Sequence, residues 1–249
     1  MRFGKLPSSA ITNHSSHHHA SQTRSRTPDN ENNSRHPYDS CTAMDSQIST
    51  LFGSGFECHD LDDTYTFWTG KLPADMNFDT AAFESLWSMH PAEYHEIMMH
   101  GRVVKTPRWQ QAFGMDYHYT GRVNTALPLP PLLKPLLIWA KKNIDEQLNG
   151  LLVNWYDGAK RHYMGRHRDS MKNIIKGVSI VTISLGEERV FRLRPFRGLE
   201  RKDFPARDGS VFVMPYETNQ AWAHEVPDSR KFNGRRISVT LRGFVELAQ

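Results

Sequence analysis

The sequence predicts a mainly β fold with flanking helices, arranged as a β-sandwich or a jelly roll. Beyond residue 150, short runs of β-branched and aromatic residues recur at near-regular spacing and are separated by turn residues. Residues 178–185 alternate in hydrophobicity, as strand residues do. Residues 190–194 follow across a turn, and residues 210–214 come directly after an Asp-Gly pair. Residues 237–245 form the last predicted strand. Several short strands of this kind indicate a two-sheet β architecture.

Two helices are predicted before the β-rich half. Asp79 can cap a helix that runs to about Met89, because a carboxylate at this position accepts hydrogen bonds from free backbone N–H groups of the first turn. Leu132 to about Leu148 keeps apolar residues at helical spacing with lysines on the other side, which indicates an amphipathic helix. The pair Asn149–Gly150 ends this helix, and we expect the helix to be part of the scaffold.

Residues 97–121 predict a hairpin followed by an aromatic surface. The pair His100–Gly101 could form the turn between two strands, which would place Met99 and the histidine at a projecting tip. Arg108 is followed by many aromatic residues at alternating positions, and this pattern suggests a half-open surface. A plain edge hairpin is the alternative.

The first fifty residues differ in composition from the rest of the chain. They are rich in Ser, Thr, Asn, His and Arg, and their apolar residues are scattered without a period. Because such a segment cannot bury enough apolar surface to fold, we expect a disordered tail at residues 1–55 and one folded domain at residues 56–249. The acid-poor stretch before Asp29 resembles an organellar transit peptide, although it lacks an amphipathic stripe.

The charge of the chain fits a nucleic-acid partner without requiring one. The formal net charge is +4 and the isoelectric point is about 9.1, values at which a protein attracts polyanions. No apolar run approaches the roughly 20 residues that a membrane-spanning helix needs. We therefore expect no membrane partner, and we expect a monomer.

The sequence His167-x-Asp169 is the strongest chemical signal in the chain. Two residues that are two apart on an extended segment point to the same side, so an imidazole and a carboxylate can take adjacent positions on a metal ion. His224 is the best candidate for a second, distant histidine. Two nitrogen ligands and one carboxylate on one face of Fe(II) leave the other face open for a co-substrate and oxygen. After His224, a strand-like run carries Arg236 and Arg242 on the same parity.

At this point the residues resemble a known family. Taken in order, Asn154-x-Tyr156, His167-x-Asp169, His224 and Arg236-x5-Arg242 resemble the AlkB-type Fe(II)/2-oxoglutarate dioxygenases. The segment from Pro107–Arg108 to Gly121 is similar to the nucleotide-recognition region of the DNA-repairing members. The resemblance covers roughly residues 95 to 245 and implies a double-stranded β-helix (jelly roll) core. It divides the folded part into a substrate-recognition region with supporting helices, residues 56–150, and a catalytic core, residues 151–249.

The resemblance also implies a role for particular residues. The implied iron ligands are His167, Asp169 and His224. The residues implied to bind 2-oxoglutarate are Asn154, Tyr156, Arg236, Ser238 and Arg242. Among these, Arg236 would hold the distal carboxylate as a bidentate pair, and Tyr156 would donate its hydroxyl to the co-substrate unless it only packs in the core. The residues implied to bind substrate are Arg108, Tyr117, Tyr119 and Met171.

The activity that the resemblance implies is oxidative demethylation of N-alkylated bases in DNA, or alternatively RNA. The reaction uses Fe(II), O2 and 2-oxoglutarate and releases succinate, CO2 and formaldehyde. The target base would leave the duplex and stack between Tyr119 and His167. The alternatives are a 2-oxoglutarate oxygenase that acts on a protein or small molecule, and an inactive nucleic-acid-binding module. The expected location is intracellular, in the nucleus, with the mitochondrion as the alternative.

The sequence departs from the family pattern at two places. Met171 stands where the repair enzymes often carry an acid that meets the exocyclic amino group of the base, so Met171 predicts weak discrimination among methylated bases; it could instead point into the core. The hairpin tip carries Met98, Met99 and His100 rather than a large aromatic wedge. Basic residues near the expected mouth would suit phosphates, or could be ordinary solvated side chains: Arg161, Arg166, Arg168, Lys172, Arg192, Arg194, Arg197, Arg201, Lys202, Arg230 and Lys231.

Overall fold

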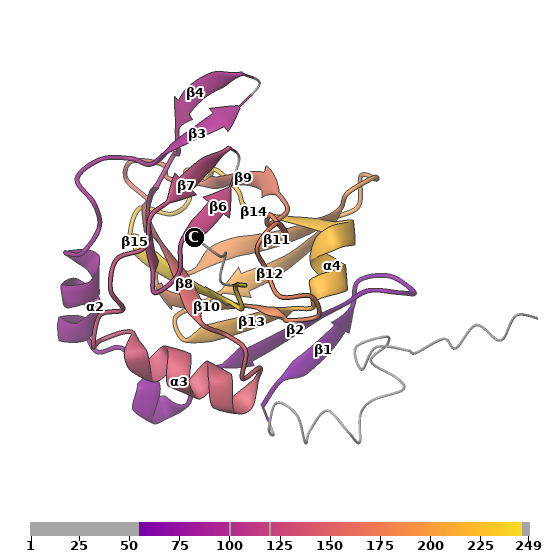
Figure 1. The fold of residues 1–249 in the computed structure, drawn as a ribbon, viewed down its shortest axis with the longest axis horizontal. Coiled ribbons are helices and arrows are strands. Elements are labelled where there is room, and N and C mark those ends of the chain that lie inside the picture. Colours follow the sequence, from indigo (N-terminus) through magenta and orange to yellow (C-terminus); the bar gives the residue numbers. More distant parts are fainter. Residues whose placement is uncertain (1–54, 100, 120, 246–249) are drawn as a thin grey trace, which may run out of the picture. The chain divides into compact units, whose positions relative to one another are not determined.

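Two antiparallel sheets form the body of the computed structural model, which describes residues 55–99, 101–119 and 121–245 (Figure 1). The strands of the seven-stranded major sheet are, in spatial order, β1 (Glu57–Asp60), β2 (Thr66–Lys71), β13 (Ser210–Met214), β10 (Ile180–Gly186), β15 (Arg235–Arg242), β8 (Gly150–Asp157) and β5 (Trp109–Phe113). The strands of the four-stranded minor sheet are β12 (Lys202–Ala206), β11 (Arg189–Pro195), β14 (Trp222–Val226) and β9 (Met164–His167).

The chain alternates between the two sheets from β8 onward. It passes from β8 to β9 in the other sheet, back to β10, across to β11 and β12, back to β13, across to β14, and ends in β15. This winding is that of a double-stranded β-helix, so the predicted jelly-roll core is confirmed. The expected tail, residues 1–55, lies outside the described residues except for Gly55. No helix in the described ranges is long and apolar enough to cross a membrane.

The major sheet is buried on both faces. Its outer face packs against α2 (Thr80–Trp87) and α3 (Lys134–Asn143), with Leu86 and Leu136 in the shared core. Its inner face packs against the minor sheet around Phe67, Phe191 and Phe212, whose rings lie within 5.9 Å of one another. A strand covered on both faces is usually rich in apolar residues, which explains the buried run Leu151, Leu152 and Val153 in the first half of β8.

The two predicted helices are present, and each is shorter than expected. Asp79 caps α2 as predicted, with its carboxylate accepting a hydrogen bond from the N–H of Ala82 at 2.7 Å. The helix α3 ends at Asn143 instead of near Leu148, because Ile144 leaves helical geometry at φ −123°. The additional short helices are η2 (Ala74–Met76) and α4 (Tyr216–Ala221).

Two small hairpins extend from the body. The predicted hairpin near His100 is present as β3 (Glu96–Met99) and β4 (Arg102–Lys105), although His100 itself lies outside the described residues. The second hairpin joins β6 (Tyr117–Tyr119) and β7 (Arg122–Asn124). In Figure 1 the two hairpins lie next to each other, with β6 and β7 beside β9 and β14 and with β3 and β4 projecting farther out.

Candidate active site

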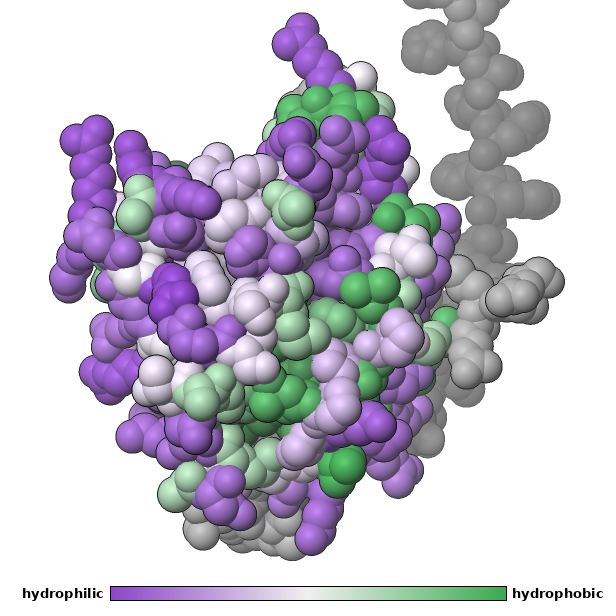
Figure 2. Space-filling model, turned by 90° about the vertical axis from the view of Figure 1, so that its left-hand side faces the viewer, coloured by the Kyte–Doolittle hydropathy of each residue, from purple (hydrophilic) through white to green (hydrophobic). Residues whose placement is uncertain are grey.

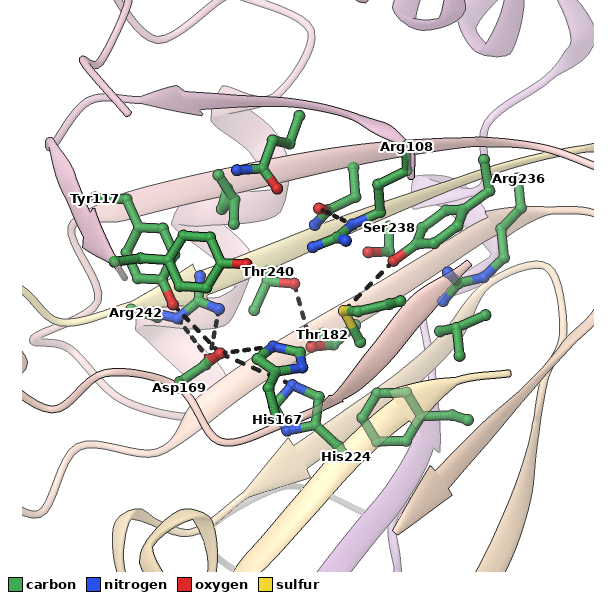
Figure 3. A pocket seen from close by; sticks show the side chains of 18 residues that line it. Arg108, Tyr117, His167, Asp169, Thr182, His224, Arg236, Ser238, Thr240 and Arg242 are labelled. Carbon is green, nitrogen blue, oxygen red and sulfur yellow. Dashed lines mark hydrogen bonds and ion pairs between the residues drawn. The ribbon is translucent and has the colours of Figure 1, made fainter. Parts of the chain in front are cut away.

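Three potential metal ligands come together where β9 and β14 pair. His167 ends β9 and lies opposite His224 of β14 in the antiparallel register, while Asp169 follows in the loop after β9. One ligand atom from each residue can be chosen so that all three lie within 4.8 Å of one another. The two imidazole rings are 4.3 Å apart between centroids. The side chains converge from two strands and a loop, as Figure 3 shows.

The protonation of the two histidines suits metal binding. The Nδ1 of His167 lies 2.9 Å from the carbonyl oxygen of Gly165, so this nitrogen carries the proton and Nε2 keeps its lone pair. That Nε2 lies 3.5 Å from Oδ1 of Asp169, and the Nε2 of His224 lies 3.8 Å from the same oxygen. Burial, followed by the charge of His167, lowers the pKa of His224 to about 3, so the ring of His224 can present a neutral ligand nitrogen.

Asp169 is held ionised by a buried ion pair. The Nε and Nη2 of Arg242 donate to Oδ2 of Asp169 at 2.9 and 2.5 Å, and the Tyr117 hydroxyl donates to Oδ1 at 3.3 Å. Burial alone would raise the pKa of Asp169, but the Arg242 charge and the two histidines hold it well below its ordinary value. For Tyr117, burial and then the Asp169 carboxylate raise the pKa. The carboxylate is therefore charged and oriented for a cation.

The donor set fits Fe(II). Two imidazoles and one carboxylate match the facial triad of non-haem iron oxygenases. The Nδ1 of His224 is buried and has no hydrogen-bond partner among the described residues. A ring nitrogen without a partner is free to adopt either tautomer as a bound metal requires.

Arg236 supplies a separate feature that fits an anionic co-substrate. Its guanidinium is 1% exposed, donates through Nε to the Ser184 hydroxyl at 2.9 Å and lies 5.0 Å from the centroid of the Tyr156 ring. Its Nη1 has no partner within the described part of the chain. Burial lowers the pKa of Arg236 to about 10, which still leaves it charged at neutral pH. A buried charge of this kind needs an anion, and a carboxylate matches a guanidinium in two hydrogen bonds.

Most of the predicted site residues line one cavity. Those on its wall are Arg108, Tyr117, Tyr119, Asn154, Tyr156, His167, Asp169, His224, Arg236, Ser238 and Arg242. Arg236 and Arg242 were predicted to lie on the same face of their strand. Figure 3 shows Arg236, Ser238, Thr240 and Arg242 projecting from one face of β15. Arg108 lies deep in this cavity, with its Nε donating to Oδ1 of Asn154 at 2.7 Å.

Met171 is not on the wall of this cavity. It packs with Ile174 and Phe244, and its sulfur accepts a hydrogen bond from Nδ2 of Asn219 at 2.8 Å. It lines a neighbouring hollow that also includes Arg168 and Phe196. The side chain therefore lines a hollow next to Asp169 and not the cavity that holds all three candidate metal ligands.

Several wall residues were not anticipated from the sequence. They are Gln110, Leu152, Met164, Thr182, Phe191, Val226 and Thr240. Gln110 is the register partner of Asn154, and Thr182 is the partner of Thr240. Their positions could have been found only by pairing the strands correctly, because a glutamine or threonine on a strand carries no motif of its own.

A double-stranded β-helix that brings together two histidines, a buried aspartate and a buried arginine whose Nη1 has no partner in the described structure fits the class of iron- and 2-oxoglutarate-dependent dioxygenases. The comparison with known families agrees: the family model for the 2OG-Fe(II) oxygenase superfamily matches residues 74–242. The chain belongs to this family, which uses Fe(II) and 2-oxoglutarate, and its relatives identify it as an AlkB-type member.

The similar proteins include enzymes named for DNA demethylation. The chain is 26% identical over 193 residues to human DNA oxidative demethylase ALKBH2, covering 73% of each chain. It is 28% identical over 149 residues to the rat alpha-ketoglutarate-dependent dioxygenase alkB homolog 3, covering 55% of this chain and 50% of the relative. A 2OG-Fe(II) oxygenase family oxidoreductase from Burkholderia pseudomallei aligns with a TM-score of 0.47 at 20% identity, covering 70% of this chain and 84% of that one.

Proposed function

We propose that the protein is an oxidative demethylase of N-alkylated bases in nucleic acid, with DNA as the preferred substrate. The observation that carries this proposal is a stacked aromatic pair on the same cavity wall as the metal ligands. The rings of Tyr117 and Tyr119 are 5.6 Å apart at an angle of 12°, and both residues line the cavity that contains His167. An aromatic platform facing a histidine can hold a flat base by stacking, which is worth roughly 1–3 kcal/mol per base. The names of the relatives support the same substrate class.

The candidate metal ligands and the two arginines of β15 would have distinct tasks in this reaction. When bound, Fe(II) supplies a centre where O2 and 2-oxoglutarate react to succinate and CO2 and oxidise the methyl carbon. Arg236 would bind the distal carboxylate of 2-oxoglutarate and so fix its orientation. Arg242 keeps Asp169 ionised, and the Gly165 carbonyl keeps Nε2 of His167 available. The hydroxylated methyl group then leaves as formaldehyde.

The β3–β4 hairpin offers an apolar surface toward the nucleic acid. Met98, Met99 and Val103 are 37%, 51% and 48% exposed, and Val123 of the adjacent hairpin is 43% exposed. Figure 2 shows apolar side chains gathered on a projection at one end of the molecule. Apolar side chains in this position can contact bases without reading their hydrogen-bonding groups.

Part of the predicted basic surface is neutralised within the protein. Arg161 pairs with Asp228, Arg192 with Asp203, and Arg194 with Glu225. Arg166 and Arg168 instead donate to backbone carbonyls of residues 195, 196 and 220. The basic residues best suited to phosphates are therefore exposed ones such as Lys172 and Arg197, which directly follow Met171 and Phe196, two residues that line the hollow.

A panel of methylated oligonucleotides, single- and double-stranded and of DNA and RNA, tests the proposal by mass spectrometry. We expect loss of one methyl group from DNA oligonucleotides only when Fe(II) and 2-oxoglutarate are both present. Turnover of 2-oxoglutarate that no methylated oligonucleotide stimulates would favour a protein or small-molecule substrate. Binding of oligonucleotides without any turnover, and without binding of iron in a titration, would indicate an inactive binding module.

The proposal extends to the domain organisation, the oligomeric state and the location of the protein. We propose that residues 56–249 act as one oxygenase domain, as a monomer in the nucleus, because the expected substrate is DNA. Sedimentation of the purified protein and imaging of a fluorescent fusion test these two points. A stable dimer, or a signal confined to mitochondria, would contradict them.

A further inference from the structure

Gln110 carries a buried amide that the fold itself does not use. The residue is 2% exposed, yet neither its Oε1 nor its Nε2 has a hydrogen-bond partner among the described residues. An amide left unpaired in the interior is unfavourable, so such groups in native proteins are uncommon and call for an explanation. Its register partner is different, since Asn154 accepts a hydrogen bond from Arg108.

The position of Gln110 places this amide in the active site. The residue lines the same cavity as the candidate metal ligands, together with Arg108, Tyr117 and Tyr119. It also lines a second hollow on the outer side, together with Tyr94 and other residues at the base of the β3–β4 hairpin. Gln110 thus lies on the wall of the cavity that holds the candidate metal ligands.

We propose that Gln110 recognises the edge of the flipped base and favours adenine methylated at N1. This inference rests on the proposed demethylase function and specifies its substrate. A primary amide offers one donor and one acceptor side by side, which match the N7 acceptor and the N6 amino donor of adenine. Methylation at N1 leaves both of these groups free.

The other methylated bases match the amide less well. Cytosine methylated at N3 offers its N4 amino group, but the neighbouring position is a carbon. Thymine methylated at N3 offers one carbonyl beside a methyl-bearing carbon. Each of these bases can form one hydrogen bond with Gln110, whereas adenine forms two. One neutral hydrogen bond corresponds to about fivefold in rate or affinity, so a preference of this size for adenine is expected.

The neighbouring glutamine provides a matched control. Gln111 points to the other face of β5, where its Nε2 donates to the carbonyls of Ala112 and Thr125 at 3.0 and 2.8 Å. Replacement of either glutamine by leucine removes the same amide from the same strand. Only the change at Gln110 should alter the choice of base.

The test compares single-stranded oligonucleotides that carry 1-methyladenine or 3-methylcytosine. We expect Gln110→Leu to lower the ratio of kcat/KM for 1-methyladenine over 3-methylcytosine by about fivefold. Without oxygen no turnover occurs, and the Kd for 1-methyladenine divided by the Kd for 3-methylcytosine should then rise by the same factor. Gln110→Glu keeps an acceptor for the amino group but loses the donor to N7, so it should shift the ratio in the same direction. Gln111→Leu should leave the ratio unchanged.

The outcomes separate this inference from the proposed function. If the wild-type protein demethylates no oligonucleotide, the proposed function is wrong, whatever the role of Gln110. If the wild type is active and a folded Gln110→Leu variant keeps the ratio within twofold, the inference about Gln110 alone is wrong. If melting curves show that neither Gln110 variant folds, the amide serves the core and the inference is also wrong.

Discussion

The two faces of β15 serve opposite purposes. On the outer face, Ile237, Val239 and Leu241 are fully buried in the core that α2 and α3 cover. On the inner face, polar residues alternate with them at equal depth: Arg236, Ser238, Thr240 and Arg242. Burial of apolar groups stabilises the fold, whereas burial of charges costs stability unless they are paired. The polar residues of the inner face therefore suit ligand binding. The apolar residues of the outer face stabilise the fold and offset the cost of burying these polar groups.

The largest effect should follow from removal of the metal-binding carboxylate. Asp169→Ala removes one of three ligands, so we expect turnover to fall by roughly a thousandfold or more, equivalent to about 4 kcal/mol. The same change leaves the Arg242 charge buried without its partner, which should cost about 3–5 kcal/mol of unfolding free energy. Turnover assays and denaturant titration measure the two effects.

A double variant separates these two consequences. Asp169→Ala combined with Arg242→Met removes the unpaired charge and keeps much of the side-chain volume. We expect it to recover most of the lost stability and none of the activity. An active single variant would refute the metal assignment, and a double variant no more stable than the single would refute the ion-pair argument.

Arg236 and Ile237 are neighbours on opposite faces of β15, so their variants test the difference between the two faces. Arg236→Met should raise the 2-oxoglutarate concentration needed for half-maximal activity by roughly tenfold to a hundredfold, because a charge-assisted pair is lost. Its effect on stability should be small, because the substitution removes a buried charge whose Nη1 has no partner in the described structure and loses only the hydrogen bond from Nε to Ser184. Ile237→Ala should instead cost about 2–5 kcal/mol of unfolding free energy and leave that requirement unchanged.

Steady-state kinetics at varied 2-oxoglutarate, run beside denaturant melts, measure both variants. The concentration of methylated oligonucleotide needed for half-maximal activity is the internal control, since Arg236→Met should raise it far less than it raises the 2-oxoglutarate requirement. Equal changes in both requirements would point to a packing role for Arg236.

The sequence predicted a candidate ligand set, whose three members the fold brings close together, and missed the contacts that orient it. His167, Asp169 and His224 could be found because the metal restricts residue type and order. Parity placed Arg242 on the cavity side of its strand, but it could not show that Arg242 pairs with Asp169, since that contact spans a loop and a distant strand. Short elements such as β12 and α4 carry too few residues for a period, and Gln110 carries no motif at all.

A smaller effect should appear in the salt dependence of nucleic-acid binding. Lys172 and Arg197 are exposed, and each phosphate contact in single strands contributes about 0.7 to the slope of log Kd against log salt. Lys172→Ala with Arg197→Ala should therefore lower that slope by about 1.4. Lys141→Ala with Lys142→Ala, an equal charge change on α3, should leave it unaltered, and equal slopes for both pairs would contradict the assigned surface.

The smallest effect concerns a histidine outside the site. Burial lowers the pKa of His162 from its ordinary value of 6.5, against the opposing effects of the Trp155 backbone and Asp157. Its Nδ1 accepts from the N–H of Asp157 at 3.1 Å, its Nε2 meets the Tyr94 hydroxyl at 3.0 Å, and Lys160 and Arg189 add positive charge nearby.

The neutral ring is therefore favoured in the folded state, and the unfolded state binds the extra proton. Stability from His162 should be complete above about pH 6.5 and should fall as the pH drops below that value. Melting temperatures at pH 7 and pH 5 measure this loss, which should be smaller in His162→Gln. A variant with the wild-type pH dependence would show that other groups cause it.

The most direct test of the account measures succinate and formaldehyde together, in one reaction with an oligonucleotide that carries 1-methyladenine. We propose that the inner face of the major sheet couples oxidation of 2-oxoglutarate to removal of the methyl group. We predict one formaldehyde for each succinate, with succinate release rising when the methylated oligonucleotide replaces its unmethylated counterpart. Succinate release that ignores the methyl group, with no formaldehyde formed, would contradict the account.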